Sequence, residues 1–185
     1  MEKHIEKEYK VLVNKKQFET LLSYYPNLKF ITQINHYYDT ITHDIIKQQA
    51  AMRIREKENS NIFTLKKFVD GDLLEYECMV EDISTNVFHT KEIKEVLTTY
   101  GIQGPFYHLT TLSTKRAVFY GNEYELCFDI NEYEDKIDYE IEYEYTKDHD
   151  GASNFQSIMD KIGITYKQNA TSKIQRALQA KGIVV

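Results

Sequence analysis

Several residue types are scarce in this chain of 185 residues, which has no Trp, two Pro, two Cys and seven Gly. The two cysteines, Cys78 and Cys127, fit reduced core residues better than a disulfide framework or a zinc site. No apolar run approaches the ~18 residues of a membrane-spanning helix. The opening MEKHIEKEYK has no apolar stretch like that of a signal peptide. These absences predict a cytoplasmic protein with no membrane partner.

An excess of positive charge is also missing, because 23 Lys and Arg stand against 29 Asp and Glu, a net charge of −6. This argues against non-specific nucleic-acid binding, although a local basic pocket stays open. The chain has no Walker-type Gly-rich loop and no GxGxxG motif, so any phosphate would be held by side chains. The six His residues lack HxxxH spacing, which favours structural or surface roles over a zinc site.

The abundant residues favour a sheet-rich fold. Tyr and Phe, with 15 and 9 copies, favour strands, and the length fits one domain over residues 1–185. Capping residues at Asn14, Thr90 and Thr171, together with helical spacing, predict helices at Lys15–Tyr24, Lys91–Thr99, Ser153–Lys161 and Ser172–Ala180. Short turns join the remaining segments, which predicts an α+β, mainly-β fold: an antiparallel closed barrel or a sandwich of about eight strands with flanking helices. The expected strands are Ile5–Val13, Ile31–Asp39, Ala50–Lys57, Ile62–Val69, Leu73–Glu81, Tyr107–Tyr120, Glu123–Asn131 and Ile137–Tyr145.

Polar and charged residues recur at every second position in five of these strands. Successive side chains of a strand point to opposite faces, so each set lies on one face. A solvated sheet face would explain one such strand. Five strands whose charged residues are sorted by sign favour a closed sheet with these residues pointing inward. Charges buried in this way must be paired or must bind a metal or a ligand. The sets are Glu6, Glu8 and Lys10; Arg53 and Arg55; Thr64 and Lys66; Glu75 and Glu77; and Asp138, Glu140, Glu142 and Glu144.

A charged interior of this kind indicates a class of ligand. Clusters of Arg and Lys hold phosphate groups, and Arg binds them bidentately. Clustered carboxylates hold hard divalent cations such as Mg²⁺ or Mn²⁺. A site that combines the two is typical of phosphoryl transfer.

The order of the motifs resembles one known family. Its ExExK opening corresponds to Glu6, Glu8 and Lys10, and the later motifs follow this opening along the chain. Together they resemble the CYTH-domain proteins, also called triphosphate tunnel metalloenzymes, from residue 5 to about 176. The small, single-domain bacterial branch is the most similar. The later motifs are Met52-Arg53-Ile54-Arg55, Thr64-Leu65-Lys66, Glu75-Tyr76-Glu77, Lys115-Arg116, Asp129, Glu140-Ile141-Glu142 and Ser172-Lys173.

The resemblance implies an eight-stranded antiparallel barrel that forms a tunnel, in which a triphosphate compound binds with Mg²⁺ or Mn²⁺. It implies candidate catalytic roles for Lys10, Glu6 and Glu8. Glu75 shares a face with Glu77 and stays an alternative acid, with Glu77 favoured. Lys115 and Arg116 point to opposite faces of a regular strand, and we choose Arg116. The implied phosphate-binding residues are Lys10, Arg53, Arg55, Lys66, Arg116 and Lys173, and the implied metal ligands are Glu6, Glu8, Glu77, Asp129, Glu140 and Glu142.

The resemblance also limits the function to a few reactions. We expect a metal-dependent triphosphatase that acts on a small molecule, with inorganic triphosphate as the first candidate and thiamine or nucleoside triphosphates as others. An adenylate cyclase that makes cyclic AMP from ATP, and a non-catalytic protein that binds nucleotides or polyphosphate, remain alternatives. The physiological substrate, the preferred metal and the oligomeric state are open at this stage.

Overall fold

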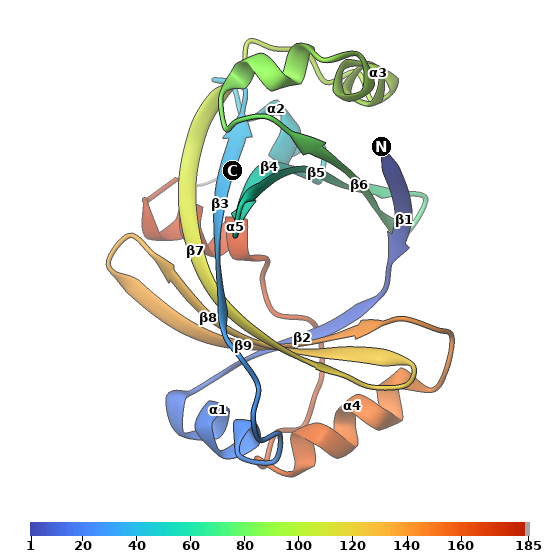
Figure 1. The fold of residues 1–185 in the computed structure, drawn as a ribbon, viewed down its shortest axis with the longest axis vertical. Coiled ribbons are helices and arrows are strands. Elements are labelled where there is room, and N and C mark those ends of the chain that lie inside the picture. The colour runs from blue at the N-terminus through green and yellow to red at the C-terminus, as the bar shows by residue number, and fades with distance from the viewer. Residues whose placement is uncertain (184–185) are drawn as a thin grey trace. The chain divides into compact units, whose positions relative to one another are not determined.

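The computed structural model describes residues 1–183 and divides into two compact units, whose elements are labelled in Figure 1. Unit 1 comprises Met1–Glu6, Gln33–Leu112 and the segment that begins at Lys173. Unit 2 comprises Lys7–Thr32 and Ser113–Ser172. The single domain that the sequence predicts over residues 1–185 stays a prediction.

Unit 1 is built on an antiparallel sheet in which neighbouring strands follow the order β1-β6-β5-β4-β3. The β5–β6 hairpin turns at Asp70 and Gly71, whose φ angles of 52° and 96° are typical of a two-residue type I′ turn. The strands are β1 (Glu2–Glu6), β3 (Ile31–Asp39), β4 (Ala50–Lys57), β5 (Ser60–Val69) and β6 (Asp72–Val80).

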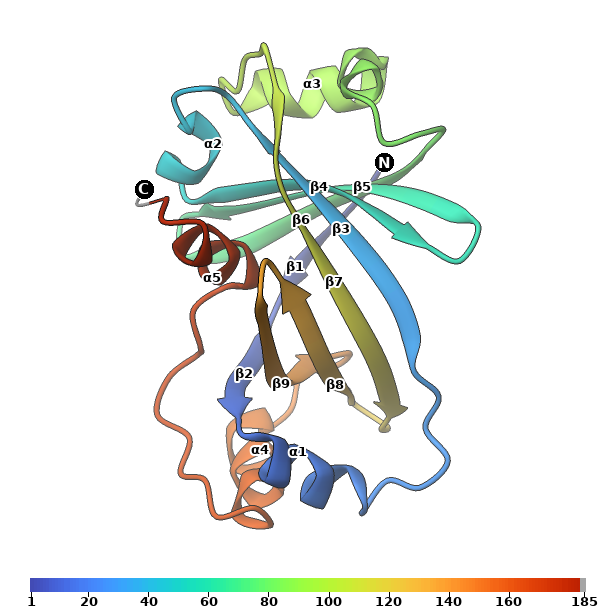
Figure 2. The same ribbon diagram turned by 90° about the vertical axis from the view of Figure 1, so that its left-hand side faces the viewer.

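One face of this sheet packs into the core of unit 1. Met52 and Ile54 of β4 and Phe63 and Leu65 of β5 are all buried there. Ile93 packs into the same core, and its helix α3 lies over the strands β4, β5 and β6 in Figure 2. The alternation predicted for β4 and β5 is therefore confirmed, and their charged residues lie on the opposite face. The helices of unit 1 are α2 (Asp44–Lys47), η1 (Thr85–His89), α3 (Lys91–Thr99) and α5 (Lys173–Ala180).

Unit 2 has a second antiparallel set of strands in the order β7-β8-β9-β2. Phe18 of α1 and Phe155 of α4 pack with Phe128 and Tyr143 in a core that these strands share with both helices. Figures 1 and 2 both show α1 and α4 side by side against these strands. The elements are β2 (Glu8–Val13), α1 (Lys15–Leu22), β7 (Tyr107–Tyr120, of which unit 2 holds the part from Ser113), β8 (Tyr124–Tyr133), β9 (Lys136–Tyr145) and α4 (Gly151–Asp160).

The largest difference from the predicted elements lies at the N-terminus. The strand expected at Ile5–Val13 starts at Glu2 and is two strands, because β1 pairs with β6 whereas β2 pairs with β9. Lys7 separates them, and its carbonyl accepts a hydrogen bond from the Tyr145 N–H at 2.9 Å. The described residues therefore contain nine strands instead of about eight. The short helices α2 and η1 were not predicted, since four or five residues are too few to show a period.

The mainly-β antiparallel fold class with flanking helices is confirmed. Asn14 caps α1 as predicted, in a capping box with Gln17. Thr90 precedes α3 as predicted, but its hydroxyl donates to the Val87 carbonyl and makes no cap. Among the described residues, we find no helix with the length and apolar character needed to cross a membrane.

Candidate functional site

The charged face of the unit 1 sheet is organised in rows across its strands. Arg53 of β4 lies opposite Thr64 of β5, and Thr64 lies opposite Glu77 of β6. Lys66 lies opposite Glu75 in the next row. Residues directly opposite one another in antiparallel strands share a face and have neighbouring Cβ atoms. The pairing register therefore brings residues from three predicted motifs into one cluster.

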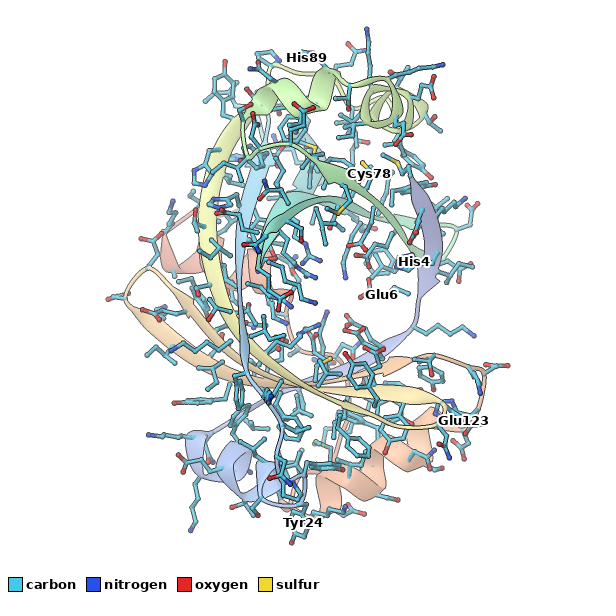
Figure 3. All side chains as sticks on the ribbon, in the orientation of Figure 1. His4, Glu6, Tyr24, Cys78, His89 and Glu123 are labelled. Carbon is cyan, nitrogen blue, oxygen red and sulfur yellow. The ribbon has the colours of Figure 1, made fainter. Side chains whose placement is uncertain are left out.

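Ion pairs connect these rows to the first strand. The Lys66 Nζ lies 2.6 Å from both carboxylate oxygens of Glu6 and 3.3 Å from Glu75 Oε2. The Arg53 Nη2 lies 3.8 Å from the other Glu75 oxygen. Figure 3 labels Glu6 on β1. The side chains of Glu6 and Glu75 are only 9% and 8% exposed, so these ion pairs are largely shielded from water.

Arg53 has the most constrained environment of this cluster. Burial opposes its charged form, but the neighbouring Tyr37, Glu75 and Glu77 outweigh this and raise the pKa of Arg53. The Arg53 Nε is one of the buried side-chain atoms of the described residues that have no hydrogen-bond partner. A buried donor without an acceptor is costly, so this position suits an anionic ligand oxygen.

Arg55 and Lys173, two further predicted phosphate-binding residues, also belong to unit 1. The Arg55 Nε donates to Asn35 Oδ1 at 3.0 Å, and Asn35 is buried on β3 opposite Arg55. Lys173 is the first residue of α5. Arg176 lies one turn further along α5 and is 8% exposed. Sequence reasoning missed Arg176, although its i, i+3 spacing from Lys173 places both on one side of the helix.

Glu77, the acid favoured from the sequence, is held in its charged form. Burial alone would raise its pKa, but hydrogen bonds with Glu75 and Thr64 and the charges of Arg53 and Arg55 lower the pKa of Glu77 below its usual value. The Thr64 hydroxyl donates to Glu77 Oε1 at 2.9 Å. Glu75 and Glu77 therefore both belong to the cluster, and the roles proposed for them remain predictions.

Thr64→Val should reduce stability in a pH-dependent way. A lowered folded-state pKa stabilises above the unfolded-state value, and this contribution is lost as the pH falls through the folded-state pKa. The Thr64→Val variant loses the hydrogen bond to Glu77, so the pKa of Glu77 rises. We expect a loss of about 1 kcal/mol at about pH 7 that shrinks towards about pH 3, measured by urea unfolding. An equal loss of stability at both pH values would contradict this expectation. The control is Thr99→Val, because Thr99 is an exposed residue of α3.

The charged face of unit 2 centres on Arg116. Arg116 of β7 lies opposite Asp129 of β8, and its Nε and Nη2 donate to the two Asp129 oxygens at 2.8 and 2.7 Å. It also donates to Glu142, and to Glu144 at 3.3 Å. Burial opposes its charge, but Asp129, Cys127 and Glu142 raise the pKa of Arg116 well above its usual value. The neighbouring Lys115 is exposed and lies opposite Ile130, so Arg116 is the residue placed in the cluster, as chosen from the sequence.

Three predicted metal ligands lie together beside Arg116. Asp129, Glu140 and Glu142 are at most 5% exposed, and each offers an oxygen within 4.8 Å of the others. Buried carboxylates at such spacing repel one another unless cations balance them. Carboxylate oxygens are the donors that Mg²⁺ and Mn²⁺ prefer, so this set fits such an ion chemically.

Glu8 and Lys10 extend the same face along β2. The Lys10 ammonium donates to Glu8, and Lys10 lies opposite Glu142 of β9. The backbone N–H of Lys10 donates to Asn169 Oδ1 at 2.8 Å. Both residues are therefore held against β9, and their ion pair places a base beside an acid at the edge of the cluster.

The sequence predicts a reduced core cysteine at Cys127, and its burial as a free thiol is confirmed. Its side chain is buried, but it lies on the charged face, opposite Glu142, with its Sγ 3.9 Å from Glu144 Oε1. Burial raises the pKa of the Cys127 thiol well above its usual value, so the thiol stays protonated. The spacing of Cys127, two residues before Asp129 on the same strand, was the signal for this face. Cys78 packs against the core of unit 1, as predicted.

The two units define a class: antiparallel sheets that each bury one apolar face under helices and carry acids and bases together on the other. The profile of the CYTH domain matches residues 4–178, and the chain belongs to the CYTH domain family. It is 29% identical over 187 residues to YjbK of Bacillus subtilis (strain 168), a candidate triphosphatase, covering 98% of each chain.

Two solved structures are also similar to this chain over nearly its whole length. A candidate adenylate cyclase from Bacillus halodurans is 34% identical with a TM-score of 0.86, covering 95% of this chain and 98% of that one. HpAC1 from Hippeastrum, a candidate adenylyl cyclase, has a TM-score of 0.72 at 22% identity over 97% of each chain. At this identity, the similarity to HpAC1 shows a shared fold and nothing further.

Proposed function

We propose that the protein hydrolyses a triphosphate in a reaction that requires Mg²⁺ or Mn²⁺, with inorganic triphosphate as the first candidate substrate. The observation that carries this proposal is that each unit shields both signs of charge on one face of its own sheet, Arg53 with Glu75 in unit 1 and Arg116 with Asp129 in unit 2. Such a face suits a ligand that is itself a polyanion with a bound cation. Membership of the CYTH family and the likeness to a candidate triphosphatase support the same reaction.

The basic residues have the role of binding phosphate oxygens. Arg53 offers a free Nε, and Lys66 replaces its contact with Glu6 by a phosphate oxygen when substrate binds. Arg116 is held rigidly by Asp129 and stabilises charge that develops on the transferred phosphoryl group. Lys10 orients the substrate beside Glu8. Arg55 and Lys173 complete the proposed set of phosphate-binding residues.

The carboxylates have the role of holding the metal. Glu6, Glu8, Glu77, Asp129, Glu140 and Glu142 are the proposed ligands, and Asp129, Glu140 and Glu142 form the most buried set. These carboxylates would hold a divalent cation, which when bound would neutralise phosphate charge and supply an activated water. The carboxylates keep the cation and the attacking group in a fixed place, and burial keeps the local dielectric low.

The direct test measures phosphate released from inorganic triphosphate by the purified protein. We expect release with Mg²⁺ or Mn²⁺, none with excess chelator, and recovery when the metal is restored. Glu6→Ala should lower the rate about 10²-fold or more. Glu95→Ala, an exposed acid on α3, is the matched control and should leave the rate unchanged. Full activity in chelator, or in Glu6→Ala, would refute the proposal.

A second reaction is favoured by the Bacillus halodurans relative, a candidate adenylate cyclase that is 34% identical. The cyclase and the triphosphatase are distinguished by their products from ATP. Cyclic AMP with pyrophosphate would identify a cyclase, whereas released phosphate with ADP would identify a hydrolase. Tight binding of ATP or triphosphate without turnover at either metal would identify a non-catalytic binding protein.

A further inference from the structure

His4 lies on the charged face of unit 1, two residues before the first predicted metal ligand. It is on β1 opposite Glu75 of β6, and Glu77 lies one row away, opposite Glu2. Figure 3 labels His4 and Glu6 on β1. The sequence predicts structural or surface roles for the six His residues, and nothing in the motif pattern singles out His4.

The three side chains of His4, Glu75 and Glu77 are close enough to bind one ion. Each offers a ligand atom, and these atoms all lie within 4.8 Å of one another. The His4 Nε2 lies 3.6 Å from Glu75 Oε2. The side chain of His4 is 49% exposed and that of Glu75 is 8% exposed. The set therefore combines an imidazole open to solvent, through which an ion can enter, with a shielded carboxylate.

A second observation at the same place concerns the anion that would accompany such an ion. The Arg53 guanidinium reaches Glu75, with Nη2 3.8 Å from Oε1, and its buried Nε has no partner. Arg53 is 8% exposed, so bulk water does not satisfy this donor. A phosphate oxygen that bridges to a cation on Glu75 would do so. Lys66 shares Glu75 Oε2 with His4, so an ion at this oxygen would displace the Lys66 ammonium and release it for a phosphate oxygen.

The nitrogen donor determines which metals fit. An imidazole suits first-row transition metals, whereas Mg²⁺ takes oxygen ligands almost entirely. A set of one imidazole and two carboxylates therefore discriminates against Mg²⁺ more strongly than an all-oxygen set of the same charge does, whereas Mn²⁺, a first-row transition metal, accepts both kinds of donor. The contribution of His4 to metal affinity should therefore be confined to the transition metals.

We propose that His4, Glu75 and Glu77 form a nitrogen-containing divalent-metal site that favours Mn²⁺ over Mg²⁺ and places the ion beside Arg53. This site shares Glu77 with the carboxylate set of the proposed function and adds His4 and Glu75, and it rests on that function only in expecting a triphosphate at Arg53. The site itself is defined by metal binding in the absence of substrate.

The test uses Mn²⁺ alone as the probe, with the whole purified chain. Pulsed electron paramagnetic resonance of bound Mn²⁺ should show coupling to an imidazole nitrogen. His4→Ala should abolish this coupling and weaken Mn²⁺ binding at least about tenfold, while Mg²⁺ affinity stays unchanged. His89→Ala is the matched control, because His89 is an exposed imidazole at the end of η1 in the same unit, labelled in Figure 3.

Glu75→Gln provides an independent check and should also weaken Mn²⁺ binding. No nitrogen coupling in the wild-type protein, or equal Mn²⁺ affinity in wild type and His4→Ala, would overturn the proposal. Triphosphate hydrolysis without nitrogen coupling would leave the proposed function standing and remove this site. Nitrogen coupling without hydrolysis of any triphosphate would support this metal site and refute the proposed function.

Discussion

Arg116→Ala is expected to destabilise the protein by about 3–5 kcal/mol, the cost of leaving a buried acid without its base. Asp129 is fully buried and receives two hydrogen bonds from Arg116, and Glu142 receives another. Removing the guanidinium leaves these carboxylates with their mutual repulsion. Urea unfolding of the purified variant, followed by circular dichroism, measures the loss.

The neighbouring residue provides the control for Arg116. Lys115 precedes it on β7, is exposed and lies opposite Ile130, so Lys115→Ala should change stability by less than about 0.5 kcal/mol. The double variant Arg116→Met with Asp129→Leu removes both charges of the pair and should recover part of the loss without activity. A stability of Arg116→Ala equal to that of the wild type would show that the buried acids do not depend on this base.

Arg53→Ala is expected to lower the kcat/KM for triphosphate by about 10²–10³-fold, the usual cost of removing one donor to developing charge. The physical reason is the unpartnered, buried Nε, which gives the ligand a donor that needs no reorganisation. Arg53→Lys keeps the charge but lacks an Nε–H, so it should restore the rate only in part. Steady-state phosphate release with Mn²⁺ measures all the variants.

Lys67 provides the matched control for Arg53. It is a base on β5 next to Lys66, on the opposite face, where its Nζ donates to the Gln48 carbonyl at 2.9 Å. Lys67→Ala should leave turnover unchanged. If Arg53→Ala keeps the wild-type rate, or if Arg53→Lys loses as much as Arg53→Ala, the unpartnered Nε has no special role in binding the substrate.

The sequence predicted the local structure of most segments well. The strands at 31–39, 50–57 and 107–120 and the helix at 91–99 have the predicted bounds. Period-2 alternation also placed Arg53, Arg55 and Lys66 on the face opposite Met52, Ile54 and Leu65. Both are properties of a few neighbouring residues, because strand geometry fixes which side chains share a face.

Period-2 alternation failed to predict burial where the environment changes along one face of a strand. Ile5 and Ile137 continue the apolar pattern of their strands, yet they are 53% and 60% exposed. Both lie near strand ends, beyond the residues that the core covers. Cys127 is buried, as its residue type predicts, but its position in β8 places it opposite the acid Glu142. Burial at such positions depends on what packs above the strand, which the strand's own sequence does not encode.

The amino-acid sequence by itself determined which residues form strands, which face of each strand carries charge, and which family the motifs resemble. Only the tertiary structure decided that the first segment divides at Lys7 between β6 and β9, and that Lys66 contacts Glu6 while Arg116 contacts Asp129. It also decided that His4 lies within reach of Glu75. The physical reason is that alternation is set within one strand, whereas partners depend on the pairing register between strands that are distant in the chain.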